Sequence, residues 1–338
     1  MTLQHALDRL TRSPWHTGAV LATAGLAGPI DVAAAGNLDG DTPFFAASAT
    51  KLLVTALVVM AELPLDVPFR HYLPGPDAAA LHVRDGRDRT DAITLRHLLQ
   101  HCSGLPDYFE SATPRRGLIG ELLAGTDRGW TFDDAMAIAR RLGPVAAPGD
   151  LRRARYADTN FQLLGRILET VEGAPLAAVV QRRFATPLGL NRTWIYADAT
   201  DTRPAVLRHR DRPLPIPKAM ASFQADGGLV TTATEGVALV RAIFGGTLLD
   251  PSKLTPLMDW RPWQFPLSYG TGLMRYALPR IFTLGRKMPP MIGHSGLSGA
   301  VLFHAPSTGL YAAGTVNQID KPSTVFRVLA RAAMARGR

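Results

Sequence analysis

Short apolar runs bounded by turn-forming residues occur near both ends of the chain. Two of them, at 17–24 and 30–36, are separated by Gly and Pro, and two more, at 299–305 and 310–317, flank Pro306-Ser307-Thr308-Gly309. Apolar runs of this length on either side of a short turn predict β-hairpins. We therefore expect an antiparallel sheet that is assembled from N-terminal and C-terminal segments.

Between these strands the apolar residues lie three and four positions apart, which is the spacing of one face of an α-helix. The predicted helices are joined by Pro- and Gly-rich connections and cover 94–101, 117–124, 131–142, 159–172 and 175–185. The same spacing predicts helices at 1–10, 52–61, 234–245 and 323–335. The chain is long enough for one large domain or for two subdomains that share an interface.

The expected fold class is α+β, with a mainly antiparallel sheet flanked by helices and with a helical subdomain. We expect a single domain over residues 1–338. Residues 1–62 and 215–338 form its sheet subdomain, and residues 63–214 form its helical subdomain. The helical segment is thus inserted between the two halves of the sheet.

The chain has 37 basic and 28 acidic residues and a formal net charge of +9. Such an excess can indicate binding to nucleic acid or to an anionic membrane. Here the basic residues occur as scattered pairs, such as Arg152-Arg153, without a long basic tract or interleaved aromatic residues. We expect a solvated basic surface, and neither nucleic acid nor a membrane as partner. The sequence does not predict an oligomeric state.

The sequence shows neither a cluster of metal-binding residues nor a targeting signal. Cys102 is the single cysteine, which excludes an internal disulfide and a cysteine cluster for a metal ion. The nine histidines are scattered along the chain, so we expect no metal and no cofactor. The first residues lack the apolar core of a secretory signal, and the run 52–61 is too short to span a bilayer. These features predict a cytoplasmic protein, or a periplasmic one if the native start has been removed.

The motif Ser48-Ala49-Thr50-Lys51 directly precedes the apolar run 52–61. If that run is a helix, side chains three positions apart lie on one face, so the Ser48 hydroxyl lies within reach of the Lys51 amine. A neighbouring amine lowers the cost of removing the serine proton, and the helix N-terminus favours developing negative charge. The motif therefore predicts a nucleophilic serine, although serine is also common at a helix N-cap.

Further segments follow this motif in an order that points to one family. They are 97–106 (HLLQHCSGLP), 156–160 (YADTN), 187–190 (PLGL), 225–229 (ADGGL) and 293–296 (GHSG). Together they resemble the serine β-lactamase and penicillin-binding-protein superfamily, and most of all its class C-type branch, which includes esterases and D-amino-acid amidases. The resemblance implies a β-lactamase/transpeptidase-like fold and a catalytic domain that forms an acyl-enzyme.

The resemblance also implies a role for each matching residue. Ser48 is the nucleophile, and Tyr156 is the base that takes its proton, with the Lys51 charge favouring the phenolate. His294 orients Tyr156 or binds a substrate acceptor; its alternative role is that of a strand-edge histidine bonded to the backbone. The backbone amides of Ser48 and Leu297 form the oxyanion hole.

Asp158 departs from the family pattern, which has asparagine at this position. An asparagine amide donates a hydrogen bond to a substrate carbonyl, whereas an ionised aspartate only accepts. This change favours esters over β-lactams and peptides as substrates, unless Asp158 simply anchors the following helix. Further candidates for substrate binding are Ser295, Gly296 and Trp263, although a tryptophan can equally belong to the core.

Three functions agree with these residues. The first is an esterase-like serine hydrolase that forms an acyl-enzyme on a small ester or amide, with acyl transfer to an acceptor as a variant. The second is a D-Ala-D-Ala carboxypeptidase or β-lactamase, whose substrates lie outside the cytoplasm. The third is a protein that binds a ligand or becomes acylated without turnover. An α/β-hydrolase is excluded because residues 293–297 lack the final glycine of Gly-x-Ser-x-Gly.

Overall fold

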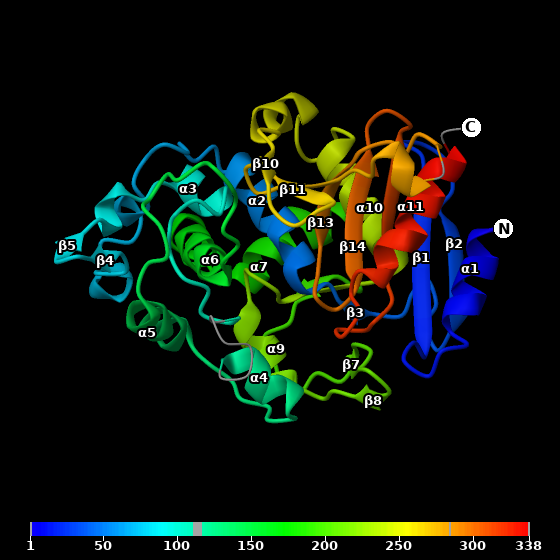
Figure 1. Cartoon of the computed structure of the whole chain (residues 1–338), viewed down its shortest axis with the longest axis horizontal. Helices are drawn as coiled ribbons and strands as arrows, with labels where there is room; N and C mark the ends of the chain where they lie inside the picture. The colour runs from blue at the N-terminus through cyan, green and yellow to red at the C-terminus, as the bar shows by residue number, and fades with distance from the viewer. Residues whose placement is uncertain (1, 111–116, 284, 337–338) are drawn as a thin grey trace.

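An eight-stranded antiparallel sheet forms one end of the molecule. The computed structural model describes residues 2–110, 117–283 and 285–336 (Figure 1). The strand order in the sheet is β10 (Arg261–Pro262), β11 (Leu267–Tyr269), β12 (Met274–Tyr276), β13 (Met291–Ser295), β14 (Ala300–Ala305), β15 (Leu310–Thr315), β1 (Gly18–Ala24) and β2 (Asp31–Gly36). The C-terminal strand β15 thus pairs directly with the N-terminal strand β1.

Helices cover both faces of this sheet. Helices α1 (Leu3–Leu10) and α11 (Thr324–Arg336) pack on one face, and α10 (Ala233–Phe244) packs on the other, together with α2 (Thr50–Met60). Alternate residues of β1 point to opposite faces, as in any pleated strand. Val20 and Ala22 join the core around α2 and α10, whereas Ala19 and Leu21 join the core beneath α1 and α11.

The other end of the molecule is mainly helical (Figure 1). Its helices are α3 (Leu95–Leu99), α4 (Leu118–Leu123), α5 (Phe132–Leu142), α6 (Asp158–Glu172), α7 (Leu176–Val180), the π-helical turn Gln181–Ala185, α8 (Thr186–Leu188) and α9 (Pro217–Phe223). Helix α2 packs on both β13 and α6, so it connects the sheet to the helical segment. The start of α2 therefore lies where the two parts of the fold meet.

Several short strands complete the fold. A small sheet has the order β3 (Phe44–Phe45), β9 (Leu229–Thr231) and β6 (Trp194–Ile195), and two hairpins are formed by β4 (Val83–Arg84) with β5 (Arg87–Asp88) and by β7 (Arg208–His209) with β8 (Arg212–Pro213). Strand β3 leads into the 3-10 turn η1 (Ala47–Ala49) and then into α2. Among the described residues, no helix combines the length and apolar character needed to cross a membrane.

The sequence-based expectation of an α+β fold is confirmed. The hairpins at 17–36 and 299–317 and the predicted helices agree with the structure to within two residues at each end, except for the helix predicted at 175–185. In the structure α7 ends at Val180, and the π-helical turn and α8 continue the segment to Leu188. Strands β10 to β13 are not predicted by the pattern of apolar residues, because three of them have only two or three residues and the loops between them contain Pro and Gly. Cys102 is buried, as expected, and burial raises the pKa of its thiol to about 11.

Candidate active site

Ser48 lies in the 3-10 turn that joins β3 to α2. Ala47 has a φ angle of 46°, in the region that non-glycine residues rarely adopt, so the turn holds the backbone before Ser48 in a strained conformation. Thr50 secures this turn: its hydroxyl donates to the Ala47 carbonyl and accepts from the Leu229 amide of β9. The N-cap of α2 is Ala49, without a side-chain cap, so the alternative role of Ser48 as an N-cap is wrong.

The ring of Tyr156 lies between two other rings. It stacks on Trp263 and on His101, with ring centroids 5.1 Å and 4.3 Å away. Its hydroxyl is buried and has no partner of normal hydrogen-bond geometry among the described residues. Burial raises the pKa of the Tyr156 phenol well above its usual value and the Asp158 carboxylate raises it further, whereas an interaction with the Ser48 hydroxyl lowers it. Tyr156 is therefore a neutral phenol in the resting site, next to Ser48.

The Lys51 side chain is fully buried, and its amine contacts two protein groups. Its Nζ lies 2.7 Å from Asp158 Oδ1 and donates to the main-chain carbonyl of Asp226 at 2.5 Å. The same Nζ is 5.1 Å from the centroid of the Tyr156 ring. Because Asp158 balances the Lys51 charge, the structure does not bear out the expectation that Lys51 shifts Tyr156 towards phenolate. Asp158 begins α6 but does not cap it, so its side chain serves the ion pair instead of anchoring the helix.

His294 lies on β13 and is completely buried. Its Nδ1 is 2.8 Å from the Ser295 carbonyl oxygen, and its Nε2 is 3.0 Å from the Tyr269 hydroxyl. A carbonyl only accepts, so Nδ1 carries the proton and Nε2 accepts from Tyr269. Burial lowers the pKa of His294 to about 3. The expectation that His294 directly orients Tyr156 or binds an acceptor therefore differs from the structure, in which both ring nitrogens bond to other protein groups.

The end of β13 approaches the Ser48 turn closely. A Cβ added at Gly296 would lie only 2.1 Å from the Ala46 carbonyl oxygen, so only glycine allows this approach. In the described residues, the backbone amides of Ser48 and Leu297 donate to no main-chain or side-chain acceptor. Leu297 and Ser48 line the same pocket. The two amides that the sequence predicts as an oxyanion hole are thus available to a ligand.

Asp226 and Tyr108 form a buried network that sequence reasoning does not predict as part of the site. The Tyr108 hydroxyl donates to Asp226 Oδ2 at 2.8 Å, and the Gln162 side-chain amide donates to the same oxygen at 3.2 Å. Burial raises the pKa of the Asp226 carboxyl well above its usual range, and Asp158 adds to this effect. The only signal in the sequence is an aspartate that stands between alanine and two glycines at 225–228.

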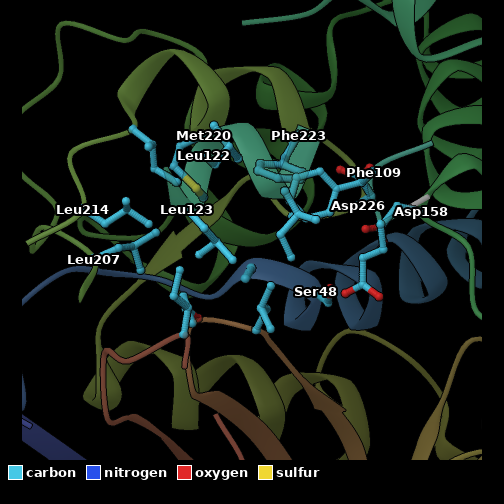
Figure 2. Close-up of a pocket in the computed structure, with 18 of the residues that line it drawn as sticks. Ser48, Phe109, Leu122, Leu123, Asp158, Leu207, Leu214, Met220, Phe223 and Asp226 are labelled. Atoms are coloured by element: carbon cyan, nitrogen blue, oxygen red, sulfur yellow. The ribbon is translucent and has the colours of Figure 1, made fainter. Parts of the chain in front are cut away.

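Ser48 stands between two concave spaces. The first is an apolar pocket whose walls come mainly from α4, α9 and the region of the β7–β8 hairpin. Figure 2 shows Leu122, Leu123, Leu207 and Leu214 on one side of this pocket and Ser48 with Asp158 and Asp226 on the other. The second space is a more open and more polar cleft. Its lining includes Tyr156, Trp263, Ser295, Gly296, Arg153 and Gln264.

The predicted substrate-binding residues are therefore divided between these spaces. Ser295, Gly296 and Trp263 line the open cleft, and Asp158 lines the apolar pocket. Ser48, Tyr156 and Leu297 line both. The Ser295 hydroxyl donates to the sulfur of Met274. Within the described residues, no group of three or more His, Cys, Asp or Glu side chains could hold a metal ion.

Comparison with known proteins assigns the family. Residues 7–335 match the Beta-lactamase family, so the chain belongs to it. Its relatives include esterase EstB from Burkholderia gladioli, which is 35% identical over 185 residues; that match covers 52% of this chain and 44% of EstB. The chain thus spans less than half the length of this curated relative.

Solved structures share the whole fold at low sequence identity. D-amino acid amidase from Ochrobactrum anthropi SV3 has a TM-score of 0.78 and 22% identity, with 99% of this chain and 100% of that chain covered. EstCE1, described as a hydrolase with promiscuous acyltransferase activity, has a TM-score of 0.79 and 20% identity, with 98% and 97% covered. At this level of identity these two structures show the fold alone.

Proposed function

We propose that this protein is a serine hydrolase that forms an acyl ester on Ser48 and acts on small carboxylic esters. The main support for this proposal is the position of Ser48. It lies beside the neutral Tyr156 phenol and next to two available backbone amides. It also lies where an apolar pocket meets an open cleft. Family membership and the esterase EstB among the relatives support the same reaction class.

In the proposed reaction the Ser48 oxygen attacks the ester carbonyl carbon, and the carbon–oxygen double bond becomes a single bond to an oxyanion. The Tyr156 phenol first loses its proton to water, and the resulting phenolate then takes the Ser48 proton. The amides of Ser48 and Leu297 donate to the oxyanion, and removal of one such donor typically costs about 3 kcal/mol of transition-state stabilisation. When the oxyanion collapses, the leaving alcohol takes the proton from Tyr156.

Deacylation repeats these steps with a second hydroxyl compound. Water gives hydrolysis, and an alcohol acceptor gives acyl transfer, because Tyr156 takes a proton from either one and returns it to Ser48. The open cleft beside Tyr156 gives such an acceptor access to the acyl ester. EstCE1, which shares the fold, is described as combining hydrolase and acyltransferase activity.

Asp158 supports esters over amides as substrates. Its Oδ1 faces Lys51 at 2.7 Å, and a carboxylate has no N–H to donate to a substrate amide carbonyl. Amides are also poorer acyl donors than esters, since their leaving groups are more basic. A D-Ala-D-Ala carboxypeptidase or a β-lactamase is therefore less well supported than an esterase.

The test is turnover of p-nitrophenyl butyrate by the wild type, by Ser48→Ala and by the surface control Ser252→Ala. We expect Ser48→Ala to lose about 10³-fold or more in kcat/KM while Ser252→Ala matches the wild type. Undiminished turnover by Ser48→Ala would refute the proposal. Nitrocefin hydrolysis at a rate equal to ester hydrolysis would favour a β-lactamase, and an acyl adduct that persists in the intact mass without turnover would favour a binding protein.

A further inference from the structure

The apolar pocket beside Ser48 has no role in the reaction steps described above. Its cavity volume is about 70 Å³. Most of its lining is aliphatic or aromatic: Phe109, Ile119, Leu122, Leu123, Leu207, Leu214, Ile216, Met220, Phe223, Leu297 and Ile319. These residues come from segments that are far apart in the sequence and converge only in the fold. A concave, mainly apolar lining with a few polar groups at one end is typical of a ligand site.

Besides Ser48, the polar side chains that line the pocket are those of Glu110, Tyr156, Asp158, Asp226 and Ser298, three of which are carboxyl groups. The Asp158 carboxylate faces Lys51, and the Asp226 carboxyl accepts from Tyr108 and Gln162. None of the described residues that line the pocket is a lysine, arginine or histidine. A carboxylate on the bound group would therefore lose its hydration without gaining a counter-ion from the described residues, which is costly. The pocket fits an uncharged group.

Ser48 fixes which end of a substrate enters the pocket. When the ester carbon bonds to Ser48, its acyl chain and its leaving oxygen must point in different directions, towards the two spaces that meet there. The leaving alcohol must then depart, and water or another acceptor must arrive, while the acyl chain stays bound. The open cleft, which is lined by Tyr156, permits this exchange, whereas the less open apolar pocket holds the acyl chain.

We propose that the apolar pocket is the acyl site and that it selects uncharged aliphatic acyl chains longer than acetyl, with the alcohol in the cleft of Trp263 and Arg153. This inference rests on the proposed function, since it names the substrate class of that reaction. Each methylene that enters such a pocket is worth about 0.8 kcal/mol, which corresponds to about a fourfold gain in kcat/KM.

The experiment measures kcat/KM for p-nitrophenyl acetate, butyrate, hexanoate and octanoate, all with the same leaving group. Wild type is expected to gain about fourfold per methylene up to the length that fills the pocket, so that hexanoate exceeds acetate by about 10²-fold. Leu123→Trp fills part of the pocket from α4 and is expected to lose most of this gain, so that the ratio of hexanoate to acetate kcat/KM falls towards one. Leu188→Trp is the matched control, because Leu188 is also half-buried but lies outside the pocket.

Several results would overturn the acyl site while leaving the proposed function intact. They are equal kcat/KM for acetate and hexanoate in the wild type, an equal loss on both esters in Leu123→Trp, and preference for the anionic p-nitrophenyl monoester of glutaric acid over the hexanoate. A second series, the acetate esters of p-cresol and 4-pentylphenol, varies the alcohol. If Leu123→Trp abolishes a gain in that series, the pocket holds the leaving group. Turnover that survives Ser48→Ala refutes the proposed function itself.

Discussion

Lys51 and Asp158 form an ion pair at 2.7 Å that is almost closed to solvent, with side-chain exposures of 0% and 8%. Two charges at this depth lose most of their hydration, and the loss is offset only while both partners are present. Loss of either charge should therefore reduce the free energy of unfolding more than loss of a charge in a surface ion pair would. It also places a negative charge close to the Tyr156 phenol, whose pKa it raises.

Removal of one partner of this pair is expected to destabilise the fold strongly. Lys51→Met leaves the Asp158 carboxylate buried without a counter-charge, and the free energy of unfolding should fall by about 3–5 kcal/mol. The double variant Lys51→Met/Asp158→Leu should recover at least half of that loss. Urea titrations of the wild type, both single variants and the double variant give the four unfolding free energies of a double-mutant cycle. Equal and additive losses would show that the two side chains do not interact in the folded protein.

The raised pKa of Tyr156 predicts an alkaline activity profile. A base whose pKa lies well above 10 is mostly protonated at neutral pH, so the reactive phenolate becomes about tenfold more abundant with each pH unit. We expect kcat/KM for p-nitrophenyl butyrate, corrected for the spontaneous reaction, to rise throughout pH 7–9. Circular dichroism over the same range checks that the fold is unchanged. A flat profile would mean that the proton passes through Tyr156 without formation of free phenolate.

Asp158→Asn is expected to change both the pH profile and the choice of substrate. Loss of the negative charge lowers the pKa of Tyr156, so ester turnover at pH 7 should increase. A fall of one pKa unit would increase turnover by about tenfold. The new amide can also donate to a substrate carbonyl, so the ratio of amide to ester turnover should increase. Asp158→Ala is the control, because it removes the charge without supplying a donor. The prediction fails if both variants show the same ratio of amide to ester turnover.

The buried neutral imidazole of His294 makes the protein sensitive to acid. Its folded-state pKa is about 3, below the usual 6.5, so the unfolded chain binds this proton first as the pH falls. Stability from this group is complete above about pH 6.5 and is lost towards pH 3. Between pH 6.5 and 4.5 the wild type should lose about 2–3 kcal/mol of unfolding free energy relative to His294→Gln. Equal losses of unfolding free energy in the wild type and in His294→Gln over this pH range would contradict a neutral His294 in the folded protein.

The sequence predicts those parts of the fold in which local pattern and tertiary environment agree. Helix α6 and the β14–β15 hairpin carry continuous apolar patterns and end at glycine, proline or polar turns, so their limits are predicted to within two residues. Strands β10 and β11 are held mainly by pairing with their neighbours, and their own residues include Arg261, Pro262 and Ser268. No local periodicity marks such strands.

In the candidate site too, the sequence predicts some features and not others. Ser48, Lys51 and Tyr156 follow from motif order, and the structure brings Tyr156 next to Ser48 and to the Lys51 amine. The partners of these groups depend on contacts across more than a hundred residues, such as the Lys51 bond to the Asp226 carbonyl. The walls of the apolar pocket are set by the same kind of contact. Sequence spacing therefore predicts the reacting groups but neither their protonation state nor the shape of the space beside them.

The pairing of β1 with β15 has a consequence for synthesis of the protein. Val20 faces Thr315 across this pair, so β1 completes its pairing only after the chain has been synthesised as far as β15. Until then β1 has β2 as its only neighbour in the described sheet. The unpaired edge of β1 is until then a natural point for chaperone binding or for misassembly.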